Sequence, residues 1–165
     1  MNLYCLGINH RTAPLEIREK LWFSAEEHRL FLPTLKEHLV TECVLTSTCN
    51  RTELYYVPRE DHTSEIPMWK VLAAQKKTEG VAGETHFYTI PSLHAVKHLF
   101  GVASGIDSMV VGDVQILNQI KEGFLLSQEL GGTGGLLNRL FTNALHVGKR
   151  ARTETEIGEG AVSIG

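Results

Sequence analysis

The sequence predicts an α+β fold, and three observations lead to that class. Short β-branched or alternating apolar segments fall between longer segments whose apolar residues recur every three or four positions. The chain has 165 residues, 42% of them hydrophobic and 21% charged, which suits one globular domain. A chain of this size buries roughly two-thirds of its unfolded surface, so it can hold a core without disulfides or metals.

The N-terminal segment predicts one strand and two helices. Apolar residues alternate along a strand at 3–9, and Pro14 starts a short helix. Ser24 and Glu27 form a capping box, which opens a longer helix. Pro33 lies inside that helix, and we expect it to kink or split the helix because proline removes a backbone hydrogen bond.

The middle of the chain predicts two consecutive strands, a helix and another strand. β-Branched residues fill 43–48 and apolar and aromatic residues fill 53–57, with a tight connection between these two strands. A helix is expected at 66–77 and a further strand at 86–90. Every expected strand so far is followed by a helix or by the next strand of a hairpin.

The C-terminal part predicts three more helices. The first spans 91–104, the second has Asp113 as its N-cap, and the third spans 136–153 after a glycine-rich break. The expected apolar stripe of the first consists of Leu93, Val96, Phe100 and Ala103. The whole order is a ferredoxin-like βαββαβ plan, a two-layer sandwich followed by additional helices.

Charge and cysteine content exclude several classes. A formal net charge of -3 argues against a protein that coats nucleic acid non-specifically, because such binding rests on neutralising phosphates. Three cysteines without CxxC spacing indicate neither a disulfide framework nor a zinc cluster. The N-terminus lacks the features of a signal peptide, and no apolar run reaches membrane-spanning length. We therefore expect a cytoplasmic protein that does not enter a membrane.

Cys49 is the candidate nucleophile. It falls at the tight connection between two expected strands, with the cation Arg51 two positions later. A nearby cation favours the thiolate, which is the nucleophilic form of cysteine. The alternative is that Cys49 packs as a small buried residue, as most free cysteines do, and we expect this for Cys5 and Cys43.

Four strings of the sequence resemble glutamyl-tRNA reductase, in that family's order and over essentially the whole chain. They are GINHRTAP at 7–14, STCNRTELY at 47–55, HLFGVASGIDSMVVG at 98–112, and KRARTET with IGEGAVS at 149–163. Together the strings are highly specific, whereas one alone would not be.

The resemblance implies NADPH-dependent reduction of glutamyl-tRNA(Glu) to glutamate 1-semialdehyde, the first step of the C5 route to tetrapyrroles such as porphyrins and haem. Cys49 attacks the ester carbonyl, releases the tRNA and holds a glutamyl thioester, which is then reduced. The resemblance also implies a homodimer formed through C-terminal helices outside this chain. It further implies hand-off of the product to glutamate-1-semialdehyde aminotransferase.

The resemblance assigns Cys49 and His98 to catalysis, with His98 as a proton relay. Arg51 would hold the side-chain carboxylate of the substrate, since a guanidinium can donate two parallel hydrogen bonds to the two oxygens of a carboxylate. The alternative for Arg51 is a surface salt bridge with Glu53 or a neighbour. The other implied substrate-binding residues are Thr48, Asn50, Ser108, Asp113, Val114, Gln115 and Gln119.

The chain departs from the family at one of these segments. The family commonly has Glu-Pro-Gln where this chain has Asp113, Val114 and Gln115. Without the proline the start of the helix is less constrained, so the assignment is stronger at Gln115 than at the two residues before it. Gln115 and Gln119 share one helix face, and the alternative for both is a solvated polar surface.

The expected domain is catalytic and binds glutamyl-tRNA over residues 1–153, and 154–165 begin a linker to a missing NADPH-binding domain. A dinucleotide site needs G-x-G-x-x-G between a strand and a helix. Gly158 and Gly160 lack the third glycine, and the break at 131–135 joins two helices, so it is expected to end a helix. NADPH is therefore expected to bind the parent enzyme outside this chain.

No metal site is expected. His94 and His98 have the spacing of helical metal ligands, but Ala95 stands where a zinc protease needs glutamate and no third ligand is evident.

Two other functions remain open. One is a cysteine hydrolase or transferase without nicotinamide chemistry, and the other is a non-catalytic binding module in which Cys49 only packs.

Overall fold

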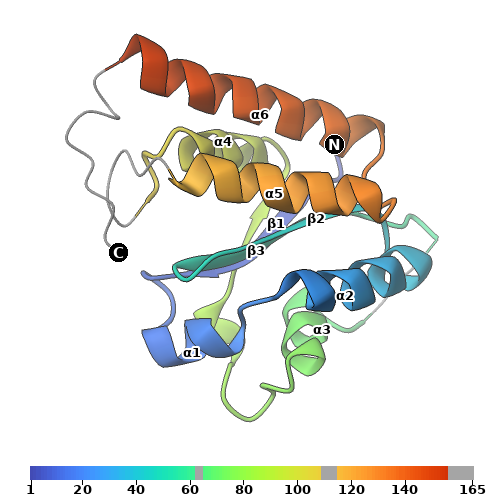
Figure 1. Cartoon of the computed structure of the whole chain (residues 1–165). Helices are drawn as coiled ribbons and strands as arrows, with labels where there is room; N and C mark the ends of the chain where they lie inside the picture. Colours follow the sequence, from blue (N-terminus) through green and yellow to red (C-terminus); the bar gives the residue numbers. More distant parts are fainter. Residues whose placement is uncertain (62–64, 109–114, 156–165) are drawn as a thin grey trace.

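The computed structural model describes residues 1–61, 65–108 and 115–155, which form a sheet with helices on both faces (Figure 1). This confirms the α+β class. The elements in chain order are β1 (Tyr4–Asn9), α1 (Leu15–Lys20), α2 (Ala25–His38), β2 (Val40–Ser47), β3 (Arg51–Pro58), α3 (Met68–Gln75), the 3-10 helix η1 (Glu84–His86), β4 (Tyr88–Pro91), α4 (Ser92–Ala103), α5 (Gln115–Glu129) and α6 (Gly135–Glu154).

The sheet has the strand order β2-β3-β1-β4, and each neighbouring pair is antiparallel. In this register Gly7 of β1 lies opposite Glu53 of β3 on one side and Tyr88 of β4 on the other. Because alternate residues of a strand share a face, Arg51, Glu53 and Tyr55 point to the same side of the sheet. The register therefore places Glu53 and Tyr88 in one row of the sheet, on either side of Gly7.

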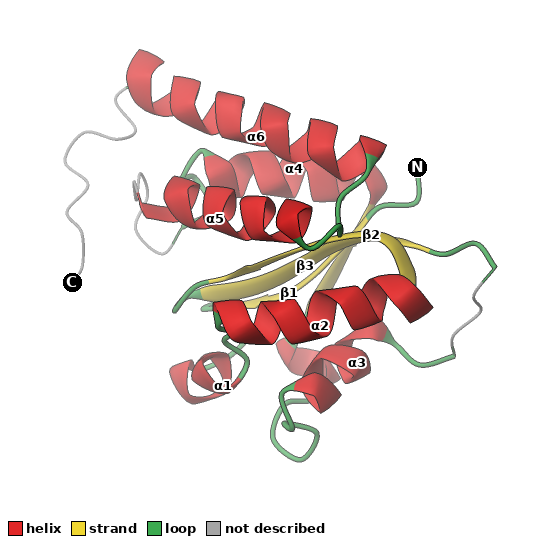
Figure 2. Cartoon of the chain, turned by 45° about the vertical axis from the view of Figure 1, so that its right-hand side comes forward, coloured by secondary structure: helices red, strands yellow, loops and turns green. Residues whose placement is uncertain are grey.

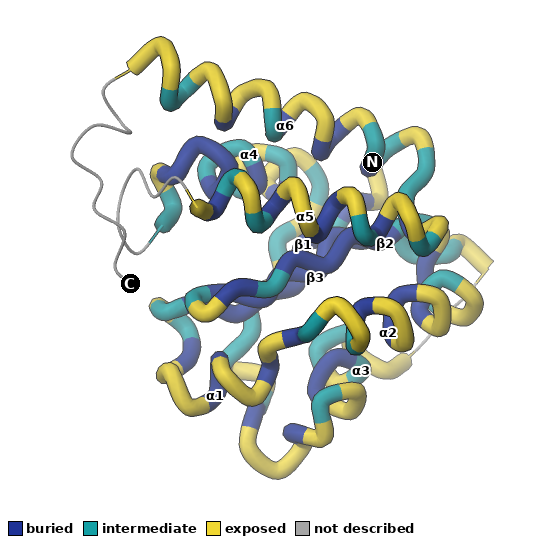
Figure 3. The backbone as a smooth tube through the Cα atoms, viewed as in Figure 1, coloured by how far each residue is buried: buried dark blue, intermediate teal, exposed yellow. Residues whose placement is uncertain are grey.

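Helices cover both faces of the sheet, because the additional helices expected after the two-layer part of the chain lie on the second face. Helices α1, α2 and α3 lie on one side, and α4, α5 and α6 form a third layer on the other (Figures 1 and 2). Leu6, Leu45 and Leu54 belong to the core on the α2 and α3 side, whereas Val44 and Tyr55 belong to the core beneath α4, α5 and α6. Figure 3 shows the strands buried between helices whose outer faces are exposed. Within the described ranges, no helix combines the length and the hydropathy needed to cross a bilayer.

Helix α2 starts as predicted but is not split. The Ser24 side chain accepts a hydrogen bond from the backbone N–H of Glu27 at 3.1 Å, so the N-cap is confirmed. The helix continues through Pro33 as one segment of 14 residues. Phe31 and Leu35 are buried on either side of the proline, and their packing offsets the one backbone hydrogen bond that proline cannot make.

The predicted apolar stripe of α4 is wrong at Leu93, which is 73% exposed, whereas Ala103 is buried and Val96 and Phe100 pack partly buried against the core. The buried residues of this helix are Ala95, Leu99, Val102 and Ala103. The helix is apolar enough to offer two overlapping stripes at helical spacing. Only the contact with the sheet, β1 and the neighbouring helices selects which of them is buried.

Gly148 of α6 permits close packing against α4. A Cβ atom at this position would lie 2.5 Å from the carbonyl oxygen of Ala103 and 2.7 Å from Cδ1 of Leu117. We expect Gly148→Ala to lower the free energy of unfolding by about 1–3 kcal/mol, because backbone must move to admit the methyl group. Urea denaturation measures this change.

Gly101 of α4 is the matched control for that substitution. It is also helical, but a Cβ atom there would meet nothing within 4 Å. Gly101→Ala should therefore raise the free energy of unfolding by about 0.5–1 kcal/mol, as alanine is the better helix former. Equal effects of the two substitutions would contradict the close approach at Gly148.

Candidate active site

The turn between β2 and β3 presents Cys49 at its tip. The backbone N–H of Thr48 donates to the carbonyl of Arg51 at 2.8 Å, which closes the turn. The Thr48 hydroxyl accepts from the backbone N–H groups of Asn50 at 3.1 Å and Arg51 at 3.2 Å. These bonds fix the backbone on both sides of Cys49, whose own side chain is exposed. The predicted placement of this residue at a tight connection is confirmed.

The structure describes all three cysteines, and Cys49 is the one that is exposed. Cys5 and Cys43 are fully buried in the two cores, as expected. Burial raises the pKa of Cys43 to about 12 and holds the pKa of Cys5 well above its ordinary value. Neither buried thiol is a nucleophile at neutral pH.

We expect a single fast-reacting thiol in the native protein. Treatment with 5,5′-dithiobis(2-nitrobenzoate) should modify about one thiol rapidly, and three after denaturation, because burial blocks the other two. In Cys49→Ser the fast phase should disappear. Rapid native modification of a second cysteine would show that Cys5 or Cys43 is more accessible than its surroundings indicate.

Cys49 opens onto a cavity of about 390 Å³ between α2, α5 and the β2–β3 turn. Thr48 and Gln119 line this cavity, so the structure brings together Cys49 and two of the predicted substrate-binding residues. The polar and aromatic lining also includes Trp22, His28, Ser47 and Glu122. Arg51 and His98 are not among the described residues of the lining.

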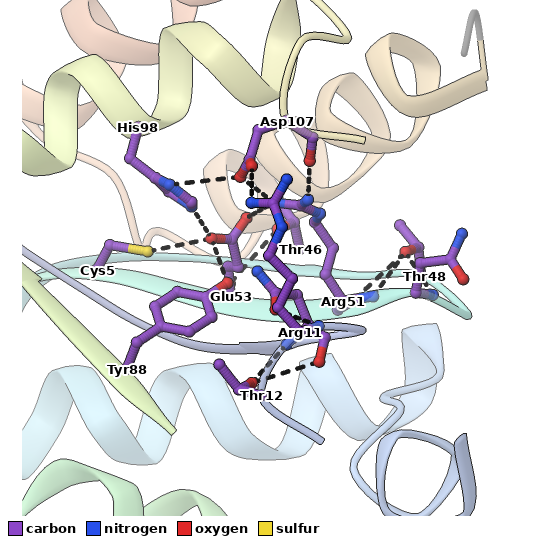
Figure 4. Close-up of polar contacts among 12 residues, drawn as sticks. Cys5, Arg11, Thr12, Thr46, Thr48, Arg51, Glu53, Tyr88, His98 and Asp107 are labelled. Atoms are coloured by element: carbon purple, nitrogen blue, oxygen red, sulfur yellow. Dashed lines mark hydrogen bonds and ion pairs between the residues drawn. The ribbon is translucent and has the colours of Figure 1, made fainter. Parts of the chain in front are cut away.

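Glu53 is the centre of a buried polar network on the sheet (Figure 4). Its side chain is 1% exposed and accepts hydrogen bonds from Arg51 Nη1 at 3.2 Å and Tyr88 Oη at 2.8 Å. His98 Nε2 contacts the same carboxylate. Tyr88 reaches Glu53 across β1 because Gly7 leaves room, since a Cβ there would lie 2.6 Å from the Tyr88 hydroxyl.

The network keeps Glu53 ionised. Burial acts to raise the pKa of Glu53, but the hydrogen bond from His98 and the charge of Arg51 outweigh it and lower the pKa to about 2. Burial acts to lower the pKa of Arg51, and the charge of Glu53 outweighs it and raises that pKa. The two groups therefore form a charged pair in the interior at neutral pH.

Asp107 connects Arg51 to the surface. The Arg51 guanidinium runs from the hairpin toward Asp107, contacting its carbonyl oxygen and lying 3.4 Å from its carboxylate (Figure 4). Arg11 Nη1 lies 2.5 Å from the same carboxylate, and His98 Nδ1 lies 3.7 Å from it. Arg11, His98 and Asp107 line a second cavity of about 370 Å³. The salt bridge considered for Arg51 is thus present, but it is buried rather than on the surface.

The other predicted residues fall into three groups. Thr48 and Asn50 shape the turn through the bonds described above. The Ser108 hydroxyl is buried and has no hydrogen-bond partner within the described ranges, and Gln115 begins α5 on an exposed face. The roles predicted for Asp113 and Val114, including the N-cap, lie outside the described residues.

Sequence reasoning considered Glu53 only as a surface partner of Arg51 and missed its contact with His98. It also missed Tyr88, Asp107 and Arg11, which complete the network. One signal was available, because Glu53 is a charged residue in the middle of an apolar strand and such a residue needs a buried partner. The partners themselves come from other elements and carry no local signal.

The glycine-rich turn is filled by the protein itself. The Glu42 carboxylate accepts from the backbone N–H groups of Gly134 at 2.6 Å and Leu137 at 2.9 Å, which caps α6. The carbonyl of Gly132 accepts from Cys43 of β2 at 2.8 Å. A phosphate would have to displace Glu42, so these residues do not fit a dinucleotide site, and the turn ends α5 and starts α6 as predicted.

Cys5, Glu53 and His98 bring ligand-type atoms within 4.8 Å of one another. Two facts favour a hydrogen-bond network over a metal site. The Glu53 carboxylate already accepts from Arg51 and Tyr88, and a metal would need the Cys5 thiolate, which burial disfavours.

The family model described as "Glutamyl-tRNAGlu reductase, N-terminal domain" matches residues 6–155. The chain is 42% identical over 165 residues to a protein of Brevibacillus brevis named "Glutamyl-tRNA reductase", covering 99% of this chain and 36% of that protein. A protein of the same name from Shouchella clausii is 44% identical over 166 residues, with the same coverage.

A solved structure, "Glutamyl-tRNA Reductase from Methanopyrus kandleri", matches with a TM-score of 0.76 and 35% sequence identity. The match covers 99% of this chain and 37% of that one. The chain thus spans a little over a third of the length of the proteins that it resembles.

Proposed function

Because the chain belongs to the glutamyl-tRNA reductase family and matches its N-terminal domain, we propose that it captures the glutamyl group of glutamyl-tRNA(Glu) on Cys49. The longer enzyme would then reduce that group to glutamate 1-semialdehyde for tetrapyrrole synthesis. The observation that carries this proposal is the exposed thiol of Cys49, held at a rigid turn and open to a cavity.

The capture step is an acyl transfer. The Cys49 sulfur, as thiolate, attacks the carbonyl carbon of the aminoacyl ester, and a carbon–sulfur bond forms. The carbon–oxygen bond to the terminal ribose breaks, and the tRNA leaves as an alcohol after gaining a proton. Ester resonance is stronger than thioester resonance, so the thioester is the better hydride acceptor.

The polar residues around the turn suit the glutamyl group. Arg51 is the cation proposed for the side-chain carboxylate, which would share or replace its contact with Asp107. Ser108 offers a buried hydroxyl, and Gln119 offers an amide in the cavity of Cys49. We propose His98 as the proton relay, positioned by contact with Glu53.

NADPH is proposed as the cofactor of the longer enzyme, where it would supply the hydride that reduces the thioester. The glycine-rich turn of this chain does not fit it, since Glu42 fills that turn. We further propose residues 1–153 as the catalytic domain, with 154–165 leading toward the NADPH-binding part.

The strand order β2-β3-β1-β4 and its antiparallel pairing support assignment of the sheet and its crossover helices to the ferredoxin-like plan. The cytoplasmic location, the homodimer formed through C-terminal helices and the hand-off to an aminotransferase stay predictions.

Radiolabelled glutamyl-tRNA(Glu) tests the proposed capture. Incubation with this chain should place label on the protein in a hydroxylamine-sensitive thioester linkage. Absence of label from a folded protein would exclude capture on Cys49, and the non-catalytic binding module would be the remaining alternative. Addition of NADPH to the longer enzyme should yield glutamate 1-semialdehyde, whereas label that is only hydrolysed or transferred would indicate the hydrolase or transferase.

Arg51→Lys should reduce labelling at a given glutamyl-tRNA concentration by tenfold or more, even though the charge is kept. A lysine ammonium is a point charge and cannot bridge two carboxylates as the planar guanidinium does. The measurement is the initial rate of labelling, with circular dichroism to confirm the fold. Near-normal labelling by a folded Arg51→Lys protein would remove Arg51 from the proposed role.

A further inference from the structure

Trp22 is an exposed aromatic residue in the cavity of the nucleophile. Its side chain is 45% exposed, although tryptophan is among the residues that gain most from burial. Single exposed apolar residues are common on protein surfaces. Trp22 differs from them because it lines the same cavity as Cys49.

The segment that carries Trp22 is attached to the hairpin of Cys49 by two hydrogen bonds. The backbone N–H of Phe23 donates to the Ser47 hydroxyl at 3.0 Å, and the Thr52 hydroxyl donates to the carbonyl of Leu21 at 3.1 Å. Ser47 and Thr52 are themselves bonded at 2.9 Å, and they flank the turn. Trp22 is therefore held at a fixed position relative to Cys49.

Phe23 strengthens this attachment from the other side. Its ring is 2% exposed and stacks on Phe31 of α2, with ring centroids 5.4 Å apart. One neighbour of Trp22 is thus anchored in the core while Trp22 itself faces outward. Such a pre-positioned aromatic ring loses little freedom when a flat ligand binds to it.

Helix α5 forms another part of the cavity wall. Gly123 lets this helix approach β2, because a Cβ there would lie 2.8 Å from the carbonyl oxygen of Leu45. The close approach brings Gln119 and Glu122 of α5 into the lining with Trp22. The cavity thus combines an aromatic face with an amide and a carboxylate.

We infer that Trp22 is the stacking platform for the base of the 3′-terminal nucleotide of the tRNA, the adenosine whose ribose carries the glutamyl ester. The inference rests on the proposed function. If the ester lies at Cys49, the base on the same ribose lies within one nucleoside of that sulfur. Bases of single-stranded RNA ends are commonly held by stacking on aromatic side chains. The Glu122 carboxylate can accept from an exocyclic amino group, which adenine has and uracil lacks.

The concentration of glutamyl-tRNA that half-saturates Cys49 labelling tests this inference. Trp22→Ala should raise it about tenfold, whereas Trp22→Phe should stay close to the unchanged protein, because phenylalanine still offers a stacking face. The labelling rate at saturation should change little, since Trp22 does not touch the reacting atoms. Leu30→Ala, which removes an exposed apolar side chain of α2 that does not line this cavity, is the matched control and should change neither value.

Fluorescence gives a second readout that does not depend on catalysis. The chain has two tryptophans, so Trp69→Phe leaves Trp22 as the single emitter. Uncharged tRNA(Glu) should quench this emission, and the same tRNA without its terminal adenosine should quench it much less. Equal quenching by both tRNAs, or unchanged half-saturation in Trp22→Ala, would overturn the inference. Absence of all labelling in the unchanged protein would instead count against the proposed function. The fluorescence quenching would still show whether the terminal adenosine stacks on Trp22.

Discussion

Cys49→Ser should remove glutamyl labelling of this chain to the background level. A serine hydroxyl at the same position is far less nucleophilic at neutral pH than a thiolate. The measurement is label retained on protein after denaturation, from radiolabelled glutamyl-tRNA(Glu).

The structure predicts that this loss is chemical and not a loss of fold. Because the Cys49 side chain is exposed and its turn is closed by Thr48, the free energy of unfolding should change by less than about 0.5 kcal/mol. Cys43→Ala is the contrasting control. It removes a buried sulfur and should cost about 1–2 kcal/mol of stability while leaving labelling intact. Label that persists in Cys49→Ser would end the assignment of the nucleophile.

Glu53→Gln should lower the free energy of unfolding by about 3–5 kcal/mol. The change keeps the shape of the side chain but removes the fully buried charged partner of Arg51 and leaves only Asp107, and breaking one side of a buried pair is strongly destabilising. It also replaces one of the two accepting oxygens of Glu53 by an NH2 group, so a single oxygen must serve Arg51 on one side and Tyr88 and His98 on the other. Urea unfolding at neutral pH measures the stability.

Glu129→Gln is the matched control for this substitution. Glu129 pairs with Arg29 at 3.0 Å, but both side chains are about half exposed, and such surface pairs contribute about 0–1 kcal/mol. A large effect for Glu53→Gln and a small one for Glu129→Gln would locate the stabilisation in the buried network. Similar small effects would mean that water or a rearrangement compensates for Glu53.

The difference in free energy of unfolding between the unchanged protein and Glu53→Gln should depend on pH, with a definite sign. The folded state lowers the pKa of Glu53 to about 2 from an ordinary value of 4.5, so ionised Glu53 contributes stability above pH 4.5. That contribution is lost as the pH falls from 4.5 toward about 2, because protons then bind the unfolded chain before the folded one. The difference in stability between the unchanged protein and Glu53→Gln should shrink across this window. A constant difference would show that Glu53 is not the titrating group.

Local sequence was sufficient to predict the elements and the position of Cys49. The capping of α2 by Ser24, the hairpin that carries Cys49 and the glycine-rich end of α5 each depend on residues a few positions apart. Backbone hydrogen bonds and steric limits act over that range, so these features can be read without knowing what packs against them.

Choices between equivalent local options needed the tertiary structure. The apolar residues of α4 allow two stripes, and packing buried Ala95 and Leu99 rather than Leu93. Likewise, the helices after β4 could join the layer of α1, α2 and α3 or cover the opposite face of the sheet. Residues of β3 are buried on both sides of the sheet, because α4, α5 and α6 cover that opposite face.

The sequence by itself therefore determined the order of the elements and placed Cys49 at a turn between two strands. Only the tertiary structure decided where the Arg51 side chain points, and it joins Arg51 to Asp107, 56 positions away. It likewise brings His98 to Glu53, 45 positions away, and places Trp22 beside Cys49. The physical reason is range, because periodicity and capping act within a few residues whereas ion pairs and packing join segments that meet only in the folded chain.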